Sequence, residues 1–324
     1  MRDISIDLVK CIAMFMVMTL HVPLVVKPDI ILSAGGYLSG IAIPLFFMVS
    51  GWLLIGKKTS WKYSVKKIIG ILKFVAIIAL AYYSVECLIY HRFSSGGLFS
   101  SIVNPFIQKG TFSVFWYLGA MILLYALLPF INYINNRWKR IGLFVAIVFL
   151  FVVESFVYPL NVLYNFEETH IIQTFRIWNW LFYFILGGFA KCYKQYFYKI
   201  PLSIPIIFAV IYIVFGWLLL PYVHAVEFLF SAPLCMMFAT SVFCYLVNCK
   251  ITQPTGVRFI KAVSKLFLPV YALHIPVILS LHYIPSGYFG IVRPILFLLF
   301  TYVGTIGVSC IVMKIPLVNK VFQI

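Results

Sequence analysis

Long apolar stretches alternate with short polar segments along the whole chain. A membrane-spanning helix needs about 20 consecutive apolar residues, and about ten stretches approach that length. They cover roughly residues 5–26, 37–55, 68–90, 114–134, 141–159, 176–192, 200–220, 228–248, 266–284 and 291–313. The pattern predicts an all-α fold: a polytopic integral membrane helix bundle, with residues 1–324 forming a single transmembrane domain and no soluble domain.

Composition and charge support a membrane protein rather than a nucleic-acid-binding one. The chain is 64% hydrophobic and only 10% charged, whereas soluble domains carry about 25% charged residues. Nearly all Lys and Arg lie in alternate gaps between the stretches, as in the gap that contains Lys57, Lys58 and Lys62. The positive-inside rule then predicts that both termini are cytoplasmic. The net charge of +17 is explained by this topology, so no nucleic-acid partner is expected.

Ionisable residues in the first apolar stretch are the strongest sign of chemistry. Lys10 and His21 are eleven residues apart, which on a helix is about three turns and returns both side chains to nearly the same face. Asp7 lies on almost the same face. Each residue also has an interpretation without a chemical role: Lys10 could reach the lipid headgroups, and His21 could be an interfacial residue. Together they suggest a base and an anion-binding cation inside the membrane.

Other polar residues in the apolar stretches allow two interpretations. Glu86 is expected to have a structural role, whereas Glu154 and His274 fit a structural or a functional role equally well. The pair Lys66 and Lys67 is either a topology signal or a site that attracts a polyanion such as coenzyme A. The seven cysteines form no pattern typical of disulfides or of metal binding, so no metal is expected.

Several motifs in order resemble acyltransferase family 3, a family of integral membrane acyltransferases. The first is the Asp7-x-x-Lys10 start followed by His21. Four more resemble later spans of the family, and they are Pro44-Leu-Phe-Phe-Met-Val-Ser-Gly-Trp-Leu-Leu54, Phe115-Trp-Tyr-Leu118 with Leu124-Tyr-Ala-Leu-Leu-Pro129, Phe182-Tyr-Phe-Ile-Leu-Gly-Gly188 and Tyr271-Ala-Leu-His274. The order of these five motifs extends the resemblance over the whole chain. Two positions depart from the family pattern: Lys10 replaces a more common Arg, and Gly70 stands where a second Arg is usual.

The resemblance implies an O-acyltransferase of a cell inner membrane or plasma membrane. Such enzymes move an acyl group, commonly acetyl, from cytoplasmic acyl-coenzyme A to a hydroxyl of an extracytoplasmic or lipid-linked glycan. The implied roles here are catalysis by His21, Lys10 and Asp7, donor binding by Lys10, Lys66 and Lys67, and acceptor binding by Trp116, Tyr117, Glu154 and His274. For Trp116 and Tyr117, the alternative is a place in the aromatic belt at the membrane interface.

Three further points stay open at the level of sequence. The transfer could be direct or could pass through an acyl-histidine. A transporter or translocase of a small solute or glycan would also use a stripe of ionisable residues as a relay, and a catalytically silent scaffold is a third possibility. Nothing in the sequence sets an oligomeric state.

Overall fold

A computed structural model describes residues 3–24, 30–90, 94–197, 200–219, 229–284 and 292–322, and within these ranges every regular element is helical. The α-helices are α1 (Ile4–His21), α2 (Ile30–Ser39), α3 (Ala42–Leu54), α4 (Trp61–Tyr90), α5 (Ser95–Val103), α6 (Trp116–Tyr164), α7 (Phe166–His170), α8 (Ile177–Cys192), α9 (Lys194–Phe197), α10 (Ser203–Leu219), α11 (Pro233–Asn248), α12 (Pro254–Lys265), α13 (Phe267–Ser280), α14 (Arg293–Val312) and α15 (Pro316–Val321). Short 3-10 helices are η1 (Val22–Leu24), η2 (Asn104–Ile107), η3 (Ser113–Phe115), η4 (Gln173–Phe175) and η6 (Leu281–Tyr283). The predicted all-α class is confirmed.

The number of spans is smaller than the sequence predicts. Among the described residues, six helices are long and apolar enough to cross a membrane, or seven if the bent pair α12 and α13 is counted as one span. The expected spans at 176–192, 200–220 and 228–248 correspond to α8, α10 and α11, which have only 16, 17 and 16 residues. At about 1.5 Å of rise per residue, the described parts of these helices are shorter than a full crossing, and residues 220–228 between α10 and α11 lie outside the described residues. The expected ten spans and the cytoplasmic termini are therefore not confirmed. Several edges of those spans, including residues 25–26, 220, 228 and 291, lie outside the described residues.

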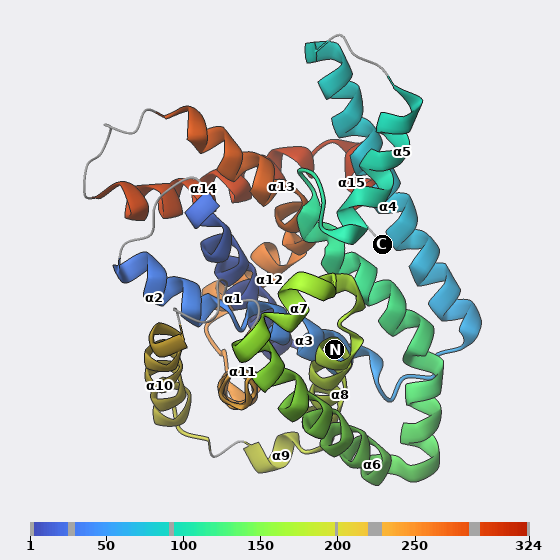
Figure 1. Cartoon of the computed structure of the whole chain (residues 1–324), viewed down its shortest axis with the longest axis vertical. Helices are drawn as coiled ribbons and strands as arrows, with labels where there is room; N and C mark the ends of the chain where they lie inside the picture. Colours follow the sequence, from blue (N-terminus) through green and yellow to red (C-terminus); the bar gives the residue numbers. More distant parts are fainter. Residues whose placement is uncertain are drawn as a thin grey trace.

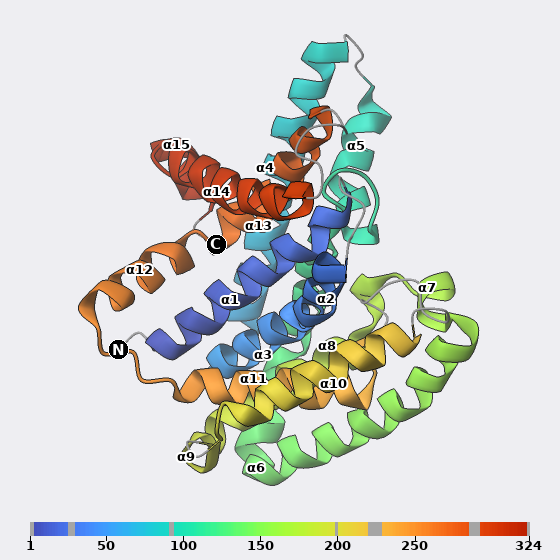
Figure 2. The ribbon, with the colours of Figure 1, turned by 90° about the vertical axis from the view of Figure 1, so that its left-hand side faces the viewer.

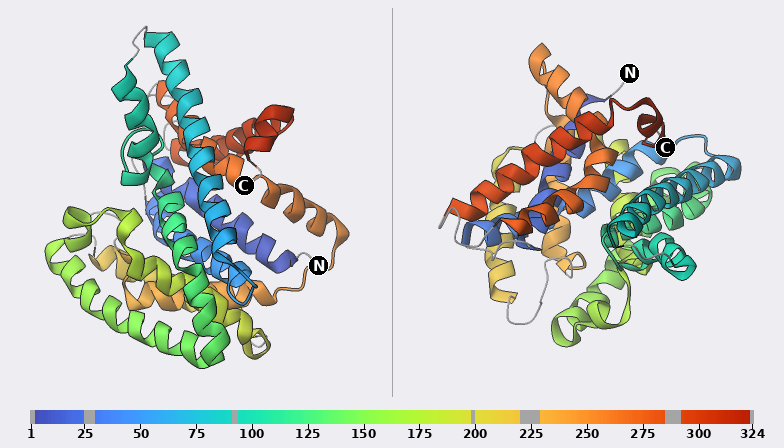
Figure 3. Two further views of the ribbon diagram at one scale, coloured as in Figure 1. Left: turned by 90° about the vertical axis from the view of Figure 1, so that its right-hand side faces the viewer. Right: turned by 90° about the horizontal axis from the view of Figure 1, so that it is seen from above.

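Two expected spans are joined in one long bent helix, α6. Its two halves, Ser113–Trp138 and Arg140–Tyr164, each qualify as a span, and Figure 1 shows α6 changing direction between them. A Cβ atom on Gly142 would lie 2.7 Å from Ile134 Cγ2. Because glycine has no side chain, Ile134 can pack closely against the backbone of Gly142 near the bend. Figure 3 shows α4 beside the first half of α6. The basic gap predicted between the spans is thus the corner of one helix.

The centre of the bundle is built on α1, α3 and α8. Helix α1 packs against α2, α3, α11, α12, α13 and α14. Figure 2 shows α1 lying between α3 and the C-terminal helices, with α12 beside its N-terminal end. Asp3 caps α1 by accepting a hydrogen bond from Ser5 N at 3.1 Å. The α1 side chains therefore face neighbours from both ends of the chain.

Helices α3 and α8 cross with their backbones in direct contact. A Cβ atom on Gly51 would lie 1.7 Å from Phe184 O, and one on Gly187 would lie 2.0 Å from Met48 O. Small residues allow such close approach in membrane proteins, where packing replaces the hydrophobic effect between helices. Large apolar side chains instead face outward, such as Phe156 (72% exposed) and Val303 (72% exposed), as expected for contact with lipid.

We expect Gly187→Ala to reduce stability by about 1–3 kcal/mol or more, because the new methyl group must separate two packed backbones. Thermal unfolding of the purified protein in detergent measures this change. Gly307→Ala in α14 is the matched control, since nothing lies within 4 Å of its Cβ position. Alanine is also the better helix former. Equal stability of the two variants would contradict the close crossing.

Candidate functional site

One face of α1 carries the residues that the sequence singled out. Lys10 Nζ lies 3.8 Å from Asp7 Oδ1, and Asp7 is buried. His21 is the last residue of α1. Between them, Met14 and Val17 fall at positions i+4 and i+7 from Lys10, so all share one face of the helix. The predicted pairing of Asp7 with Lys10 and the alignment with His21 are present in the structure.

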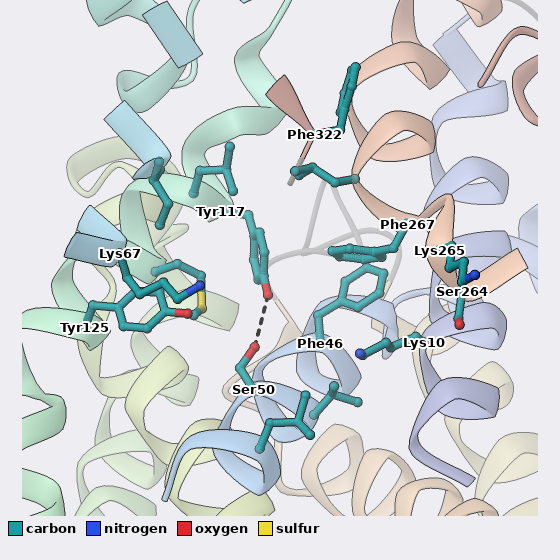
Figure 4. A pocket seen from close by; sticks show the side chains of 16 residues that line it. Lys10, Phe46, Ser50, Lys67, Tyr117, Tyr125, Ser264, Lys265, Phe267 and Phe322 are labelled. Carbon is teal, nitrogen blue, oxygen red and sulfur yellow. Dashed lines mark hydrogen bonds between the residues drawn. The ribbon is translucent and has the colours of Figure 1, made fainter. Parts of the chain in front are cut away.

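Lys10 lines a cavity with a volume of about 480 Å³. We call it the lysine cavity, because Lys67 of α4 and Lys265 of α12 also line it. Figure 4 shows the Lys10 and Lys67 side chains approaching the cavity from opposite sides. The other lining residues are Phe46, Val49, Ser50, Leu53, Ile71, Tyr117, Leu118, Met121, Tyr125, Ser264, Phe267, Leu268 and Phe322. The cavity thus joins cationic groups with an apolar wall.

Lys66 and Lys67, which were both expected to bind the donor, lie on different sides of α4. Lys67 lines the cavity, whereas its neighbour Lys66 is exposed and does not. Consecutive residues of a helix point about 100° apart, so only one of the pair can face inward. The structure therefore separates the two expected donor-binding lysines, and donor binding by Lys66 stays a prediction. Lys265, the last residue of α12, was not among the expected site residues, but it lines the cavity.

At the other end of α1, His21 lies beside His274. Their ring centroids are 5.2 Å apart, and the ring planes meet at 39°. His274 belongs to α13 and is completely buried, whereas His21 is partly exposed. The two residues are 253 positions apart in the chain, and no local sequence pattern indicates their contact. His274, which was expected to bind the acceptor, thus lies beside the expected base His21.

Hydrogen bonding fixes the tautomer of neutral His274. Its Nδ1 lies 2.8 Å from Tyr271 O and 3.2 Å from Val270 O. Carbonyl oxygens only accept, so the proton of the neutral ring must be on Nδ1. Nε2 then carries a lone pair, and it has no hydrogen-bond partner among the described residues. His274 can consequently accept a hydrogen bond from the ring beside it.

The lysine cavity has two lining residues in common with a second cavity, which lies beside His274. A second, small cavity is lined by His274 and shares Phe46 and Phe267 with the lysine cavity. The rings of Phe46 and Phe267 are 5.0 Å apart in an edge-to-face arrangement, and Figure 4 shows them together at one side of the lysine cavity. Met14, Val17 and Met18 line it from α1. One helix face therefore runs from a cationic cavity to a pair of imidazoles.

The adjacent aromatic residues Trp116 and Tyr117 have different places. Tyr117 lines the lysine cavity, where its hydroxyl lies 3.4 Å from Ser50 Oγ. Trp116 lines neither cavity, and its ring packs 4.9 Å from that of Trp180. Both are buried, so neither forms an exposed interfacial belt. Tyr117 therefore lies at the candidate site, whereas Trp116 packs in the helix bundle against Trp180.

Glu154 is completely buried but lines neither cavity. Both of its carboxyl oxygens have no hydrogen-bond partner among the described residues. Glu167 of α7 instead accepts hydrogen bonds from Asn161 at 2.6 Å, Trp178 at 2.9 Å and Asn179 at 2.8 Å. These bonds hold α7 against the first turn of α8. The structure does not bring Glu154 to the histidine pair.

Metal-binding geometry was searched for among the described residues, and no group of three or more His, Cys, Asp or Glu side chains suited to a metal ion was found. The histidine pair is suited to acid–base chemistry. An imidazole can accept and return a proton near neutral pH without any other ligand.

Comparison with known proteins gives one match. A family described as "Acyltransferase domain" matches residues 3–314, nearly the whole chain. No curated protein and no solved structure matches. The match covers the histidine pair and all residues that line the two cavities except Phe322.

Proposed function

The chain belongs to the acyltransferase domain family, and from this premise we propose that it moves an acyl group from cytoplasmic acyl-coenzyme A to a hydroxyl of an extracytoplasmic or lipid-linked glycan. The family makes the protein a membrane acyltransferase. Beyond the family, we propose the acyl donor, the acceptor and a location in the inner or plasma membrane. The observation that carries it is the single face of α1 that leads from the lysine cavity to His21 and His274.

The lysine cavity suits the phosphates of coenzyme A. Lys10 and Lys67 supply positive charge from two helices, and ammonium groups bind phosphate oxygens through charge-assisted hydrogen bonds. The apolar wall formed by residues such as Leu53 and Ile71 suits the uncharged arm that carries the thioester. The positive-inside rule assigns the basic end of α4 to the cytoplasm, where acyl-coenzyme A would be found.

The histidine pair suits proton transfer from an acceptor hydroxyl. In the proposed reaction His274 Nε2 accepts the N–H of His21 and so orients that ring. The other nitrogen of His21 takes the proton of the hydroxyl as its oxygen attacks the thioester carbonyl. A carbon–oxygen bond forms, the carbon–sulfur bond breaks, and the proton passes from His21 to the leaving thiolate. Burial of His274 limits access of water that would hydrolyse the thioester.

We expect Lys67→Ala to weaken binding of acetyl-coenzyme A by roughly 10-fold, the worth of about one charge-assisted hydrogen bond. Titration of the purified protein with acetyl-coenzyme A measures the affinity. Lys66→Ala is the matched control, because it removes the same charge one residue away from an exposed position outside the cavity. Its affinity should stay within about twofold of the wild type, since surface charges contribute little.

Two outcomes would count against the proposal. If the wild-type protein neither binds acetyl-coenzyme A nor releases its thiol in the presence of membrane glycans, the acyl donor is wrong. If Lys66→Ala and Lys67→Ala weaken binding equally, the cations act only through the general field of the protein, and the lysine cavity is not the donor site.

A further inference from the structure

Helix α12 carries three basic residues on one face. Arg258, Lys261 and Lys265 occupy positions i, i+3 and i+7, so their side chains leave the helix in nearly the same direction. All three residues are exposed. Ile260 and Val263 are buried on the opposite side, where α12 packs against α1. We call Arg258, Lys261 and Lys265 the basic row, which extends about 10 Å along the helix.

The basic row ends at the lysine cavity. Lys265 is the last residue of α12 and lines that cavity together with Lys10 and Lys67. Figure 4 shows Lys265 on the same side of the cavity as Lys10. The following segment, Phe267–Tyr283, is bent from α12 by 64°, and Figure 2 shows α12 at the edge of the molecule. The cavity therefore has an exposed, cationic approach that begins outside it.

The acidic residues that the structure describes do not neutralise the basic row. No Asp or Glu follows Glu227 in the sequence. On the neighbouring α1, Asp7 lies 3.8 Å from Lys10, and the N-cap residue Asp3 lies 3.4 Å from Lys194. Within the described part of the chain, no ion pair involves a member of the basic row. Its positive charge thus stays available to an anion in solution.

We propose that the basic row guides the acyl donor into the lysine cavity. The inference rests on the proposed function and adds how the donor reaches its site. Coenzyme A carries several negative charges on its phosphates, and a surface of one sign of charge accelerates the association of a ligand of the opposite sign. Charges act over about 8 Å at physiological ionic strength. Arg258 and Lys261 therefore attract the donor before it enters, whereas Lys265 meets it at the cavity.

The experiment measures the association and dissociation rates of fluorescent etheno-coenzyme A with the purified full chain in detergent, by rapid mixing. We expect Arg258→Gln/Lys261→Gln to lower the association rate about 3- to 10-fold at low ionic strength. The dissociation rate should stay within about twofold of the wild type, because neither residue lines the cavity. The difference in association rate should disappear in about 1 M salt, where the screening length falls to about 3 Å.

Arg137→Gln/Arg140→Gln is the matched control, because it removes the same charge from two exposed residues at the corner of α6. Neither residue lines the lysine cavity, and Figure 2 shows α6 and α12 at different edges of the molecule. Its association rate should stay within about twofold of the wild type, since surface charges more than a screening length away contribute little. Equal slowing by the two double variants would assign the effect to net charge and overturn the guiding role.

The other outcomes separate this inference from the proposed function. An unchanged association rate in folded Arg258→Gln/Lys261→Gln would overturn the guiding role and leave the proposed function standing. If that variant instead loses bound phosphatidylglycerol, the basic row binds lipid headgroups rather than the donor. If the wild-type protein fails to bind etheno-coenzyme A, the proposed function and the guiding role are both overturned.

Discussion

His21→Ala is expected to lower the rate of acyl transfer by roughly 10²–10⁴-fold, the usual contribution of a general base. His21 ends α1 beside the buried His274 and at the end of the face that begins at the lysine cavity. His21→Gln can still form hydrogen bonds but cannot take up a proton near neutral pH, so it should be almost as slow. Thiol release from acetyl-coenzyme A in the presence of membrane glycans measures the rate.

The loss should occur without loss of the fold or of the donor site. Alanine is the best helix former, and Lys10 and Lys67 remain in place. His282→Ala is the matched control, because this histidine lies exposed in η6, beyond the helix that carries His274. It should retain wild-type activity. Wild-type turnover by His21→Gln would eliminate proton transfer by His21.

Replacement of His274 should have the second largest effect. His274→Leu removes the Nε2 lone pair beside His21 and the Nδ1 proton that Tyr271 O accepts at 2.8 Å. When a base is no longer held in its reactive orientation, the rate typically falls roughly 10²-fold. Because His274 acts through His21, kcat should fall while the affinity for acetyl-coenzyme A changes little. Steady-state kinetics together with donor titration separate the two quantities.

His274→Gln supplies the control for a purely structural effect. Its side-chain oxygen can accept a hydrogen bond, so it should recover part of the activity that His274→Leu loses. A mere packing role predicts that Leu, an apolar residue suited to a buried site, is tolerated at least as well as Gln. Wild-type kcat in His274→Leu, or a loss of donor binding equal to the loss of kcat, would contradict the positioning role.

Much of the fold was predictable because burial in lipid and helix formation leave a periodic mark on the sequence. The stretches at 5–26 and 68–90 correspond to α1 and α4. The span count was not predictable in the same way. Hydropathy alone does not distinguish a helix of 16 residues, such as α11, from one that crosses fully. Nor does it reveal that α6 continues through a basic corner, where Gly142 lies close to Ile134.

At the site, too, local features could be predicted from the sequence, whereas contacts between distant residues could not. The alignment of Lys10 with His21 follows from helix geometry, and the structure places Lys10 at the lysine cavity and His21 beside His274. The contact of His21 with His274 depends on the packing of α1 against α13, which no local pattern encodes. Adjacent residues were also hard to separate. Tyr117 lines the lysine cavity and Trp116 does not, because their side chains leave the helix in different directions.

The most direct test of the account is the sidedness of the reaction, which follows from a donor cavity at one end of α1 and the histidine pair at the other. Acetyl-coenzyme A with a labelled acetyl group, which does not cross membranes, is supplied to inverted membrane vesicles and to sealed right-side-out vesicles, each containing the protein or its His21→Gln variant. The account predicts that label appears on membrane glycans only when the wild-type protein meets the donor at the cytoplasmic face, in the inverted vesicles. Labelling that requires the donor at the outer face, or equal labelling by His21→Gln, would contradict it.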